Sequence, residues 1–467
     1  MATVALTDKE VFQPRIVPLD DRHGWGFALL VVTTGTLFLR PADLVPELDK
    51  LPIYQCMIIA CLIVSARTIL KQLAKIQLND QPITACLLLL LIAVGVSHLV
   101  HGFVWGARMS MMEFSKTIAF YLLVTGLLNT PRRLYLFTKF LTLAITFVAA
   151  LALLDRFELL DISALEPIQD RGVGENAGML DRIRGTGIFN DPNDFGLILV
   201  TGLILSVAFL TRRRIGWPRH LWLVPAVVLF VVLVMTHSRG AFLSLACAIP
   251  AVFAYRKGLR IGIASLIILP LLTVVMSARM SDFNSIHDGT GQTRIQIWSD
   301  SLFIFRQYPL FGLGEGLLVE ELGVVAHNSF IHCFAELGFF GGTAFVGCFL
   351  AAGLGLWALR IAPTEIRRIA SMKRDSNDIA HLRVFLFAAL TAYAGGMMAL
   401  SRQFITPTYL VLGLAGAAQS IQGVTETVQR QQDKRWSINN RFVLTATATS
   451  SASLIVFYLA VKILIRI

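Results

Sequence analysis

Charged residues are scarce in this chain of 467 residues. Asp, Glu, Lys and Arg make up 15% of the sequence, whereas a soluble domain carries about 25%. Hydrophobic residues make up 55% and occur in long unbroken runs. Because one core cannot bury so much apolar surface, we expect lipid to cover part of it. The long runs also argue against a β-barrel, whose strands alternate polar and apolar residues over about 10 positions.

Cysteine is also rare, and none of the six cysteines belongs to a CxxC pair. All six lie in apolar segments, so we interpret them as small hydrophobic residues rather than disulfides or metal ligands. The sequence also lacks a P-loop, a GxGxxG motif between a strand and a helix, and the HExxH spacing of zinc enzymes. We therefore expect no cofactor and no metal site. Because cytoplasmic ATP is disfavoured as an energy source, an activated substrate already in the membrane fits better.

Apolar segments of membrane-spanning length dominate the chain. They predict helices near 23–40, 52–70, 84–105, 111–129, 134–155, 193–211, 221–237, 240–255, 261–278, 331–359, 384–402, 405–421 and 442–464. The expected fold class is all-α, a polytopic transmembrane bundle of about 12–13 helices. In this prediction residues 23–421 form the catalytic bundle, after a tail at 1–22. A linker at 422–441 leads to one extra C-terminal transmembrane helix within 442–467.

Arginine and lysine predict which side of the membrane each loop faces. The net charge of +11 arises mainly in short loops, which is typical of cytoplasmic loops rather than of a nucleic-acid surface. Six basic clusters fall on one side when the predicted spans are counted, around Lys71, Arg132, Arg212, Arg256, Arg367 and Arg430. The tail shows no cleavable signal peptide, so we place it and the linker in the cytoplasm. Two long loops, about 156–192 and 279–330, then lie on the outer side, where we expect the chemistry.

The first outer loop ends in a glycine-rich run, RGTGIFNDPND at 184–194. Its glycines allow the backbone to approach a ligand closely. Asn190 or Asp191 is suited to cap the next helix, and Pro192 suits its first turn. The exposed N–H groups of that turn can hold an anion, with Arg184 adding a full charge. A capped helix with a surface arginine is the simpler alternative.

A second arginine lies in the run THSRGAFLS at 236–244, in a tight connection between two spans. This connection is predicted at the outer membrane boundary. The Arg239 guanidinium there either extends to the lipid headgroups or makes bidentate contacts with a phosphate. Both interpretations remain open.

The second outer loop combines three motifs. TRIQIW at 293–298 begins an amphipathic pattern with Arg294, and YPLFGLGEG at 308–316 contains Glu315. The loop closes with AHNSF at 326–330, directly before a span. The imidazole of His327 is suited to take or give a proton near neutral pH. A lone histidine is more often structural, but one followed by Asn and Ser after two glycine-rich turns favours a functional site.

Taken in order, these motifs resemble the O-antigen ligase and O-antigen polymerase superfamily of bacterial inner membranes. The resemblance covers about residues 84–420 and depends on RGTGIFNDPND, THSRGAFLS, TRIQIW with YPLFGLGEG, and AHNSFIHCFAELGFFGG. The span count and the long outer loop before the His-Asn motif agree with it. The last span at 442–464 departs from the commoner twelve-span layout.

The resemblance implies a multi-pass inner-membrane protein with a cytoplasmic N-terminus, two long periplasmic loops and a periplasmic active face. It implies a metal-independent, inverting transfer of a glycan from undecaprenyl diphosphate to an acceptor hydroxyl. In polymerases the acceptor is another lipid-linked glycan, and in ligases it is lipid A-core or protein. Membrane lipids and a flippase or chain-length regulator are further expected partners, and nucleic acid is not one.

Fixed guanidinium groups suit the negative charge that develops on a departing diphosphate. The predicted substrate-binding residues are Arg184, Arg239, Arg294, Asn190 and Asn193. The predicted catalytic residues are His327, which orients or deprotonates the acceptor hydroxyl, Asn328, which positions it, and Glu315 as a further partner in the same loop.

A transporter of lipid-linked glycan or of a small anion such as bicarbonate is the alternative function. A carrier is expected to have broken helices and a central ionisable site. The charges here gather instead at the outer face, which favours the enzyme. Ligase and polymerase both need the same diphosphate site, so the sequence leaves the choice between them open.

Overall fold

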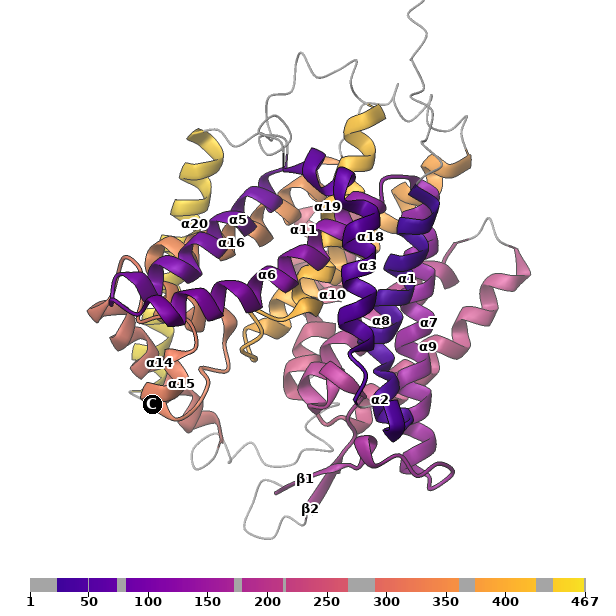
Figure 1. The fold of residues 1–467 in the computed structure, drawn as a ribbon, viewed down its shortest axis with the longest axis horizontal. Helices are drawn as coiled ribbons and strands as arrows, with labels where there is room; N and C mark the ends of the chain where they lie inside the picture. The colour runs from indigo at the N-terminus through magenta and orange to yellow at the C-terminus, as the bar shows by residue number, and fades with distance from the viewer. Residues whose placement is uncertain are drawn as a thin grey trace, which may run out of the picture.

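The computed structural model describes residues 23–48, 50–73, 81–171, 179–212, 216–267, 290–360, 374–425 and 440–465, and these are mostly helical (Figure 1). The α-helices are α1 (His23–Leu39), α2 (Pro41–Leu44), α3 (Ile53–Gln72), α5 (Pro82–Leu99), α6 (Val104–Leu127), α7 (Pro131–Arg156), α8 (Pro192–Leu210), α9 (Leu223–Met235), α10 (Arg239–Lys257), α11 (Leu259–Ala264), α14 (Thr290–Gln307), α15 (Leu317–Leu322), α16 (Ser329–Ala358), α18 (Arg374–Met397), α19 (Thr406–Thr425) and α20 (Asn440–Leu464). Short 3-10 helices are η1 (Pro46–Leu48), η2 (Ser163–Leu165), η3 (Gly187–Phe189), η5 (Trp217–Trp222) and η6 (Ser265–Ile267). The two strands are β1 (Ile168–Arg171) and β2 (Met179–Arg182). The predicted all-α fold class is confirmed.

Eight of the described helical segments are long and apolar enough to cross a membrane. They are Ile53–Gln72, Pro82–Leu99, Pro131–Arg156, Pro192–Leu210, Trp217–Met235, Ser329–Ala358, Ile379–Met397 and Arg441–Leu464, and Gly24–Leu39 is a shorter apolar helix. Every predicted span overlaps a described helix. The span predicted at 261–278 is described only as far as Ile267, and the tail at 1–22 and most of the linker lie outside the described residues. The chain is a multi-pass membrane protein.

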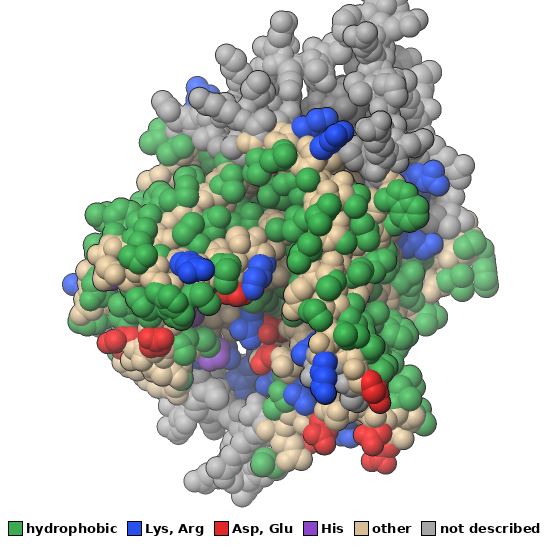
Figure 2. Space-filling view, in the orientation of Figure 1, with side chains coloured by type: hydrophobic (Ala, Val, Ile, Leu, Met, Phe, Trp, Pro, Cys, Tyr) green, Lys and Arg blue, Asp and Glu red, His purple; other side chains and the backbone are tan. Residues whose placement is uncertain are grey.

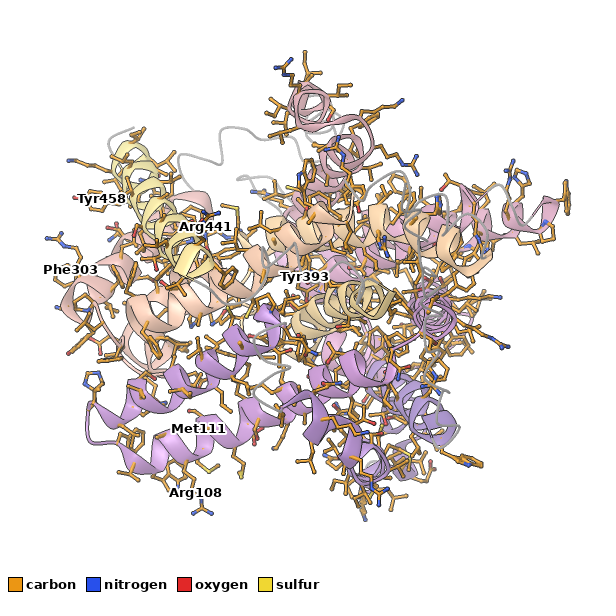
Figure 3. The ribbon with its side chains drawn as sticks, turned by 90° about the horizontal axis from the view of Figure 1, so that it is seen from above. Arg108, Met111, Phe303, Tyr393, Arg441 and Tyr458 are labelled. Carbon is orange, nitrogen blue, oxygen red and sulfur yellow. The ribbon has the colours of Figure 1, made fainter. Side chains whose placement is uncertain are left out.

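Buried aromatic side chains and close helix contacts form the core. α5 packs against α6 and α16, and α8 packs against α9, α10 and α18. Tyr121, Tyr393 and Tyr409 are among the largest fully buried side chains. Figure 3 shows Tyr393 in the middle of the bundle, whereas Phe303 of α14 lies at its edge. The six cysteines are free thiols.

The helix predicted at the C-terminal end is α20. It packs against a helix of the second long loop and against the helix that follows this loop. Its contacts are with α16 and α14. Val461 is buried in a cluster with Leu302 and Ile331. Arg441 and Tyr458 lie on α20 at the edge of the bundle (Figure 3).

The described parts of both long loops lie in the lower half of the view in Figure 1, where β1, β2, α14 and α15 are found. β1 and β2 form an antiparallel hairpin that pairs Ile168 with Arg182. The segment after β2 is fastened to the end of α1 and to α2. The Thr186 hydroxyl donates to the Phe38 carbonyl at 2.9 Å, and the Gly187 N–H donates to the Asp43 carboxylate at 2.6 Å. The first loop therefore has a defined position against the bundle.

Helix α16 is interrupted at Gly338, whose φ of 63° and ψ of −165° are not helical. Backbone groups freed by a break inside a membrane need new partners. The segment at 309–314 provides them: the Leu313 and Gly314 N–H groups donate to the carbonyls of residues 335 and 336 at 3.0 and 2.9 Å. In return, the N–H groups of residues 339 and 340 donate to the carbonyls of residues 309 and 310 at 2.7 and 3.1 Å. The segment at 309–314 of the second loop is thus hydrogen-bonded to the backbone of α16 on both sides of the break.

We expect Gly312→Ala to lower the unfolding temperature in detergent more than Gly316→Ala does. Both glycines have a positive φ, 76° and 82°, so both alanines carry left-handed strain of about 1–2 kcal/mol. A Cβ at position 312 would also stand 2.2 Å from the backbone of Glu336, whereas nothing lies within 4 Å of one at position 316. Equal losses for the two variants would show that this close approach does not contribute to stability.

Candidate functional site

The start of α8 organises the first set of charged residues. Asp191 is its N-cap, and its carboxylate accepts from the Asn193 and Asp194 N–H groups at 2.8 and 3.3 Å. Of the two caps that the sequence allowed, the structure uses Asp191. Asn190, a predicted substrate contact, is exposed at the end of η3. Because the cap carboxylate already occupies the first N–H groups of α8, an anion there depends on the neighbouring arginines instead.

Asn193 connects this helix start to the turn before α10. Its Oδ1 accepts from Arg182 Nη2 at 2.9 Å and from the Ser238 hydroxyl at 2.8 Å. Arg182 Nε donates to the Thr236 carbonyl at 3.0 Å, and the Ser238 side chain caps α10. These bonds hold Arg182 and the first residue of α10, Arg239, at the same end of the bundle. Asn193 therefore positions the arginines.

The segment at 398–405, between α18 and α19, adds a further arginine to this end. Arg402 forms an ion pair with Asp194, and their side chains are 25% and 11% exposed. The Ser329 hydroxyl donates to the Leu400 carbonyl at 2.5 Å and accepts from the Arg402 N–H at 2.8 Å. The first turn of α16 and the first turn of α8 thus hold Arg402 from two sides.

Arg294 lies in the first half of α14, close to the same positive charges. Burial, together with the charges of Arg239 and Arg182, lowers the pKa of Arg294. Neither Arg239 nor Arg294 has an acidic partner in an ion pair within the described ranges. An anion bound among these guanidinium groups is stabilised by all of them.

His327 stands beside this positive field. It precedes α16 with a left-handed φ of 50°, and Asn328 caps the helix by accepting from the N–H groups of residues 330 and 331 at 3.0 and 3.2 Å. Burial and the charges of Arg294 and Arg402 lower the pKa of His327. The imidazole is therefore neutral at neutral pH and free to accept a hydrogen bond. Asn328 fixes the backbone on which it stands.

Figure 2 shows where basic, acidic and histidine side chains gather on one face. They lie around a hollow in the lower middle of the view, below an apolar surface and above the region of β1 and β2. Apolar surface beside a charged hollow suits a ligand with a lipid tail and an anionic head. Among the described residues, no three His, Cys, Asp or Glu side chains are close enough together to hold a metal ion.

Two predicted residues stand apart from the arginines. Arg184 is half-buried with its Nε buried and without a hydrogen-bond partner, and it is not among the charges that lower the pKa of Arg294 or His327. Burial raises the pKa of Glu315, despite a hydrogen bond from Ser110 of α6, and its charged neighbours are Glu336 and His332. Glu315 therefore belongs to a second polar group inside the bundle.

That second group contains an ion pair that was not predicted from the sequence. His332 Nε2 and Glu336 Oε1 are 2.9 Å apart, and both side chains are almost fully buried. His332 Nδ1 is 2.9 Å from the Ser401 hydroxyl. An ionisable pair four residues apart inside an apolar span is itself a sign of function. Arg402 was another sign of function in the sequence. The predicted topology places it on the outer side of the membrane, opposite the six basic clusters.

The fold and site define a membrane-embedded protein with a group of neighbouring arginines at one end of its bundle. Residues 224–346, which include Arg239, Arg294 and His327, match the model of a family described as O-antigen ligase. Over 178 residues the chain is 29% identical to an O-antigen polymerase of Salmonella muenchen. That alignment covers 34% of this chain and 44% of the relative, so it spans less than half of that protein's length. The two matches confirm the predicted resemblance to the O-antigen ligase and polymerase superfamily.

We expect Asp194→Ala and Arg402→Ala each to lower the free energy of unfolding by about 3 kcal/mol, because each leaves a buried charge without its partner. The double variant should lose less than the sum of the two, by about 0.5–3 kcal/mol. Unfolding by titration with a denaturing detergent measures all four proteins of the cycle. Strict additivity would contradict a direct interaction between the two side chains.

Proposed function

We propose that this protein is a glycan transferase of O-antigen or exopolysaccharide synthesis. It moves a glycan from undecaprenyl diphosphate to an acceptor hydroxyl at the periplasmic face of the bacterial inner membrane. The observation that carries this proposal is the group of four arginines, Arg182, Arg239, Arg294 and Arg402, around a neutral histidine at one end of the bundle. The family match over residues 224–346 supports the same class of reaction.

The arginines stabilise the departing diphosphate. As the bond between the sugar and the phosphate breaks, negative charge grows on the diphosphate oxygens. Arg239 and Arg294 have no acidic partner within the described ranges, so their charge is available to that anion. Arg402 is partly neutralised by Asp194, and Arg182 is held by Asn193. The two pairs of arginines thus differ in role: one binds the anion directly, and the other sets the shape and field of the hollow.

His327 orients the acceptor glycan by accepting a hydrogen bond from one of its hydroxyl groups. The oxygen of another acceptor hydroxyl attacks the anomeric carbon opposite the diphosphate, so the anomeric centre is inverted, as the resemblance implies. In this proposal no step passes through a metal or a cofactor. Predicted Asn190 and Arg184 remain candidates for contacts with the glycan or the diphosphate further out in the first loop.

Ligase and polymerase differ only in the acceptor, and the names of the matched family and of the relative represent both. In a deletion strain, loss of long chains with single repeats kept on the acceptor indicates a polymerase. Loss of all attached glycan with accumulation of lipid-linked polymer indicates a ligase. A flippase and a chain-length regulator are the proposed partner proteins.

A transporter is the second candidate, and one observation favours it. α16 is broken at Gly338, beside the buried His332–Glu336 pair, and carriers also have broken helices with ionisable groups. The backbone at this break is paired with the segment at 309–314, which leaves less of it available for an ion. The comparison with an O-antigen polymerase also favours the transferase.

We expect Arg239→Ala and Arg294→Ala each to reduce the transfer rate of the purified protein by about 100-fold, since each removes one preorganised donor from a developing anion. The substrate is undecaprenyl-diphosphate-linked glycan, with added lipid A-core, and the products are extended or ligated glycan. Arg306→Ala is the matched control, because Arg306 is an exposed arginine in the last turn of the same helix as Arg294. Rates within about threefold of the wild type for both site variants would exclude these assignments.

The pH dependence of transfer provides a separate test. Burial and neighbouring arginines hold the pKa of His327 below its usual 6.5. The neutral form that accepts the hydrogen bond is therefore the main form above pH 6.5, and it is lost as the pH falls through the lowered pKa. We expect a constant rate between about pH 7 and 8 and a decline only below about pH 6.5. A rate that already falls by half between pH 8 and 7 would contradict a neutral His327.

A further inference from the structure

Ser401, His332 and Glu336 form a continuous line of hydrogen bonds next to the arginines. His332 Nε2 lies 2.9 Å from Glu336 Oε1, and His332 Nδ1 lies 2.9 Å from the Ser401 Oγ. With Glu336 ionised and His332 neutral, Nε2 donates to the carboxylate and Nδ1 accepts from the serine hydroxyl. This is the order of groups that activates a hydroxyl in serine hydrolases.

We propose that these three residues form the proton relay of the glycan transfer, in which Ser401 takes the proton of the acceptor hydroxyl and His332, supported by Glu336, is the final base. This inference rests on the proposed function. It adds which residues receive the proton that the acceptor hydroxyl loses. Ser401 is the catalytic residue that touches the acceptor, and His332 and Glu336 act through it.

The surroundings of Glu336 fit a group that stabilises a positive charge on His332. Its side chain is 1% exposed, and its Oε2 is buried without a hydrogen-bond partner. Its Oε1 also accepts from the Gly316 N–H at 2.9 Å. Among the ion pairs of the described residues, the one that involves this carboxylate is with His332. A carboxylate beside an imidazole offsets the positive charge that proton transfer places on the ring.

The position of Ser401 is fixed by the same helix that carries His332. Ser329, three residues before His332 on α16, binds the carbonyl of residue 400 and the N–H of residue 402. The backbone on both sides of Ser401 is therefore tied to α16, and the hydroxyl cannot drift from the imidazole. Ser401 is also the most exposed of the three residues, at 9%, compared with 4% and 1% for the other two.

The relay lies beside the arginines and His327. Both His332 and Arg402, the neighbour of Ser401 in the chain, contribute to the electrostatic field at His327. Positive charges of Arg294 and Arg402 oppose protonation of His327. His332, by contrast, is paired with the Glu336 carboxylate. His327 thus suits a hydrogen-bond acceptor that orients the acceptor glycan through another of its hydroxyl groups, and His332 suits the group that keeps the proton.

The transfer forms one bond to the anomeric carbon and breaks one. The acceptor oxygen forms a bond to the anomeric carbon while the bond from that carbon to the diphosphate oxygen breaks, and its electron pair leaves with the diphosphate. The acceptor proton moves to Ser401 Oγ as the serine's own proton moves to His332 Nδ1. The imidazolium then pairs with the Glu336 carboxylate, and no oxidant or second reactant is needed.

The test compares kcat, KM and thermal unfolding for purified variants with undecaprenyl-diphosphate-linked glycan and lipid A-core. We expect Ser401→Ala and Glu336→Gln each to lower kcat by about 100-fold, the usual contribution of general-base catalysis, with KM for the donor unchanged. Gln keeps the size of Glu and an oxygen for the Gly316 N–H, so Glu336→Gln tests the charge without opening a cavity. Ser206→Ala removes a buried hydroxyl that bonds only its own helix at Gly202, and it should transfer at the wild-type rate.

Two comparisons separate a relay from a purely structural clamp. Ser329→Ala loosens residues 400–402 but keeps the Ser401 hydroxyl, His332 and Glu336, so it should lower the unfolding temperature and lower kcat less than Ser401→Ala does. Equal losses of kcat in Ser329→Ala and Ser401→Ala, or a Glu336→Gln variant with wild-type kcat, would overturn the relay. Wild-type protein that transfers no glycan would instead refute the proposed function itself.

Discussion

Mutual repulsion between like charges in a partly buried space is the constraint on which this structure depends. Arg182, Arg239 and Arg294 are close enough for their charges to lower the pKa of one of them, and Arg402 adds a fourth charge nearby. Such a group persists only if rigid elements hold each member, because burial weakens the screening by water. Many of the hydrogen bonds at this end of the bundle hold the arginines in place.

Short polar side chains at helix starts provide the rigidity. Asp191, Ser238 and Asn328 cap the helices α8, α10 and α16. Each cap fixes the backbone next to a functional side chain: Asn193, Arg239 and His327, respectively. Ser329 then ties the segment before α19 to the same place. The loops outside the membrane and the helices within it therefore form one unit, and the pairing of the segment at 309–314 with broken α16 extends that unit into the bundle.

Local patterns were sufficient to predict much of this from sequence. Apolar runs predicted the helices because a membrane imposes length and composition on each span. The motifs around Arg239, Arg294 and His327 predicted residues whose charges act on one another. The ion pair between Asp194 and Arg402 was missed because it joins residues 208 positions apart, and no local pattern encodes that contact. The break at Gly338 was missed for a similar reason, since its hydrogen bonds come from another segment. The spacing of His332 and Glu336 inside an apolar span could have predicted a buried pair. The sequence prediction instead assigned the acceptor hydroxyl to His327, which lies in the loop before that span.

The central claim is that the basic hollow cleaves a sugar from a lipid diphosphate. The most direct measurement counts products from the purified wild-type protein in liposomes that contain undecaprenyl-diphosphate-linked glycan and lipid A-core. The account predicts one molecule of undecaprenyl diphosphate released for each new glycosidic bond. Movement of intact lipid-linked glycan across the bilayer with no release of undecaprenyl diphosphate would contradict it.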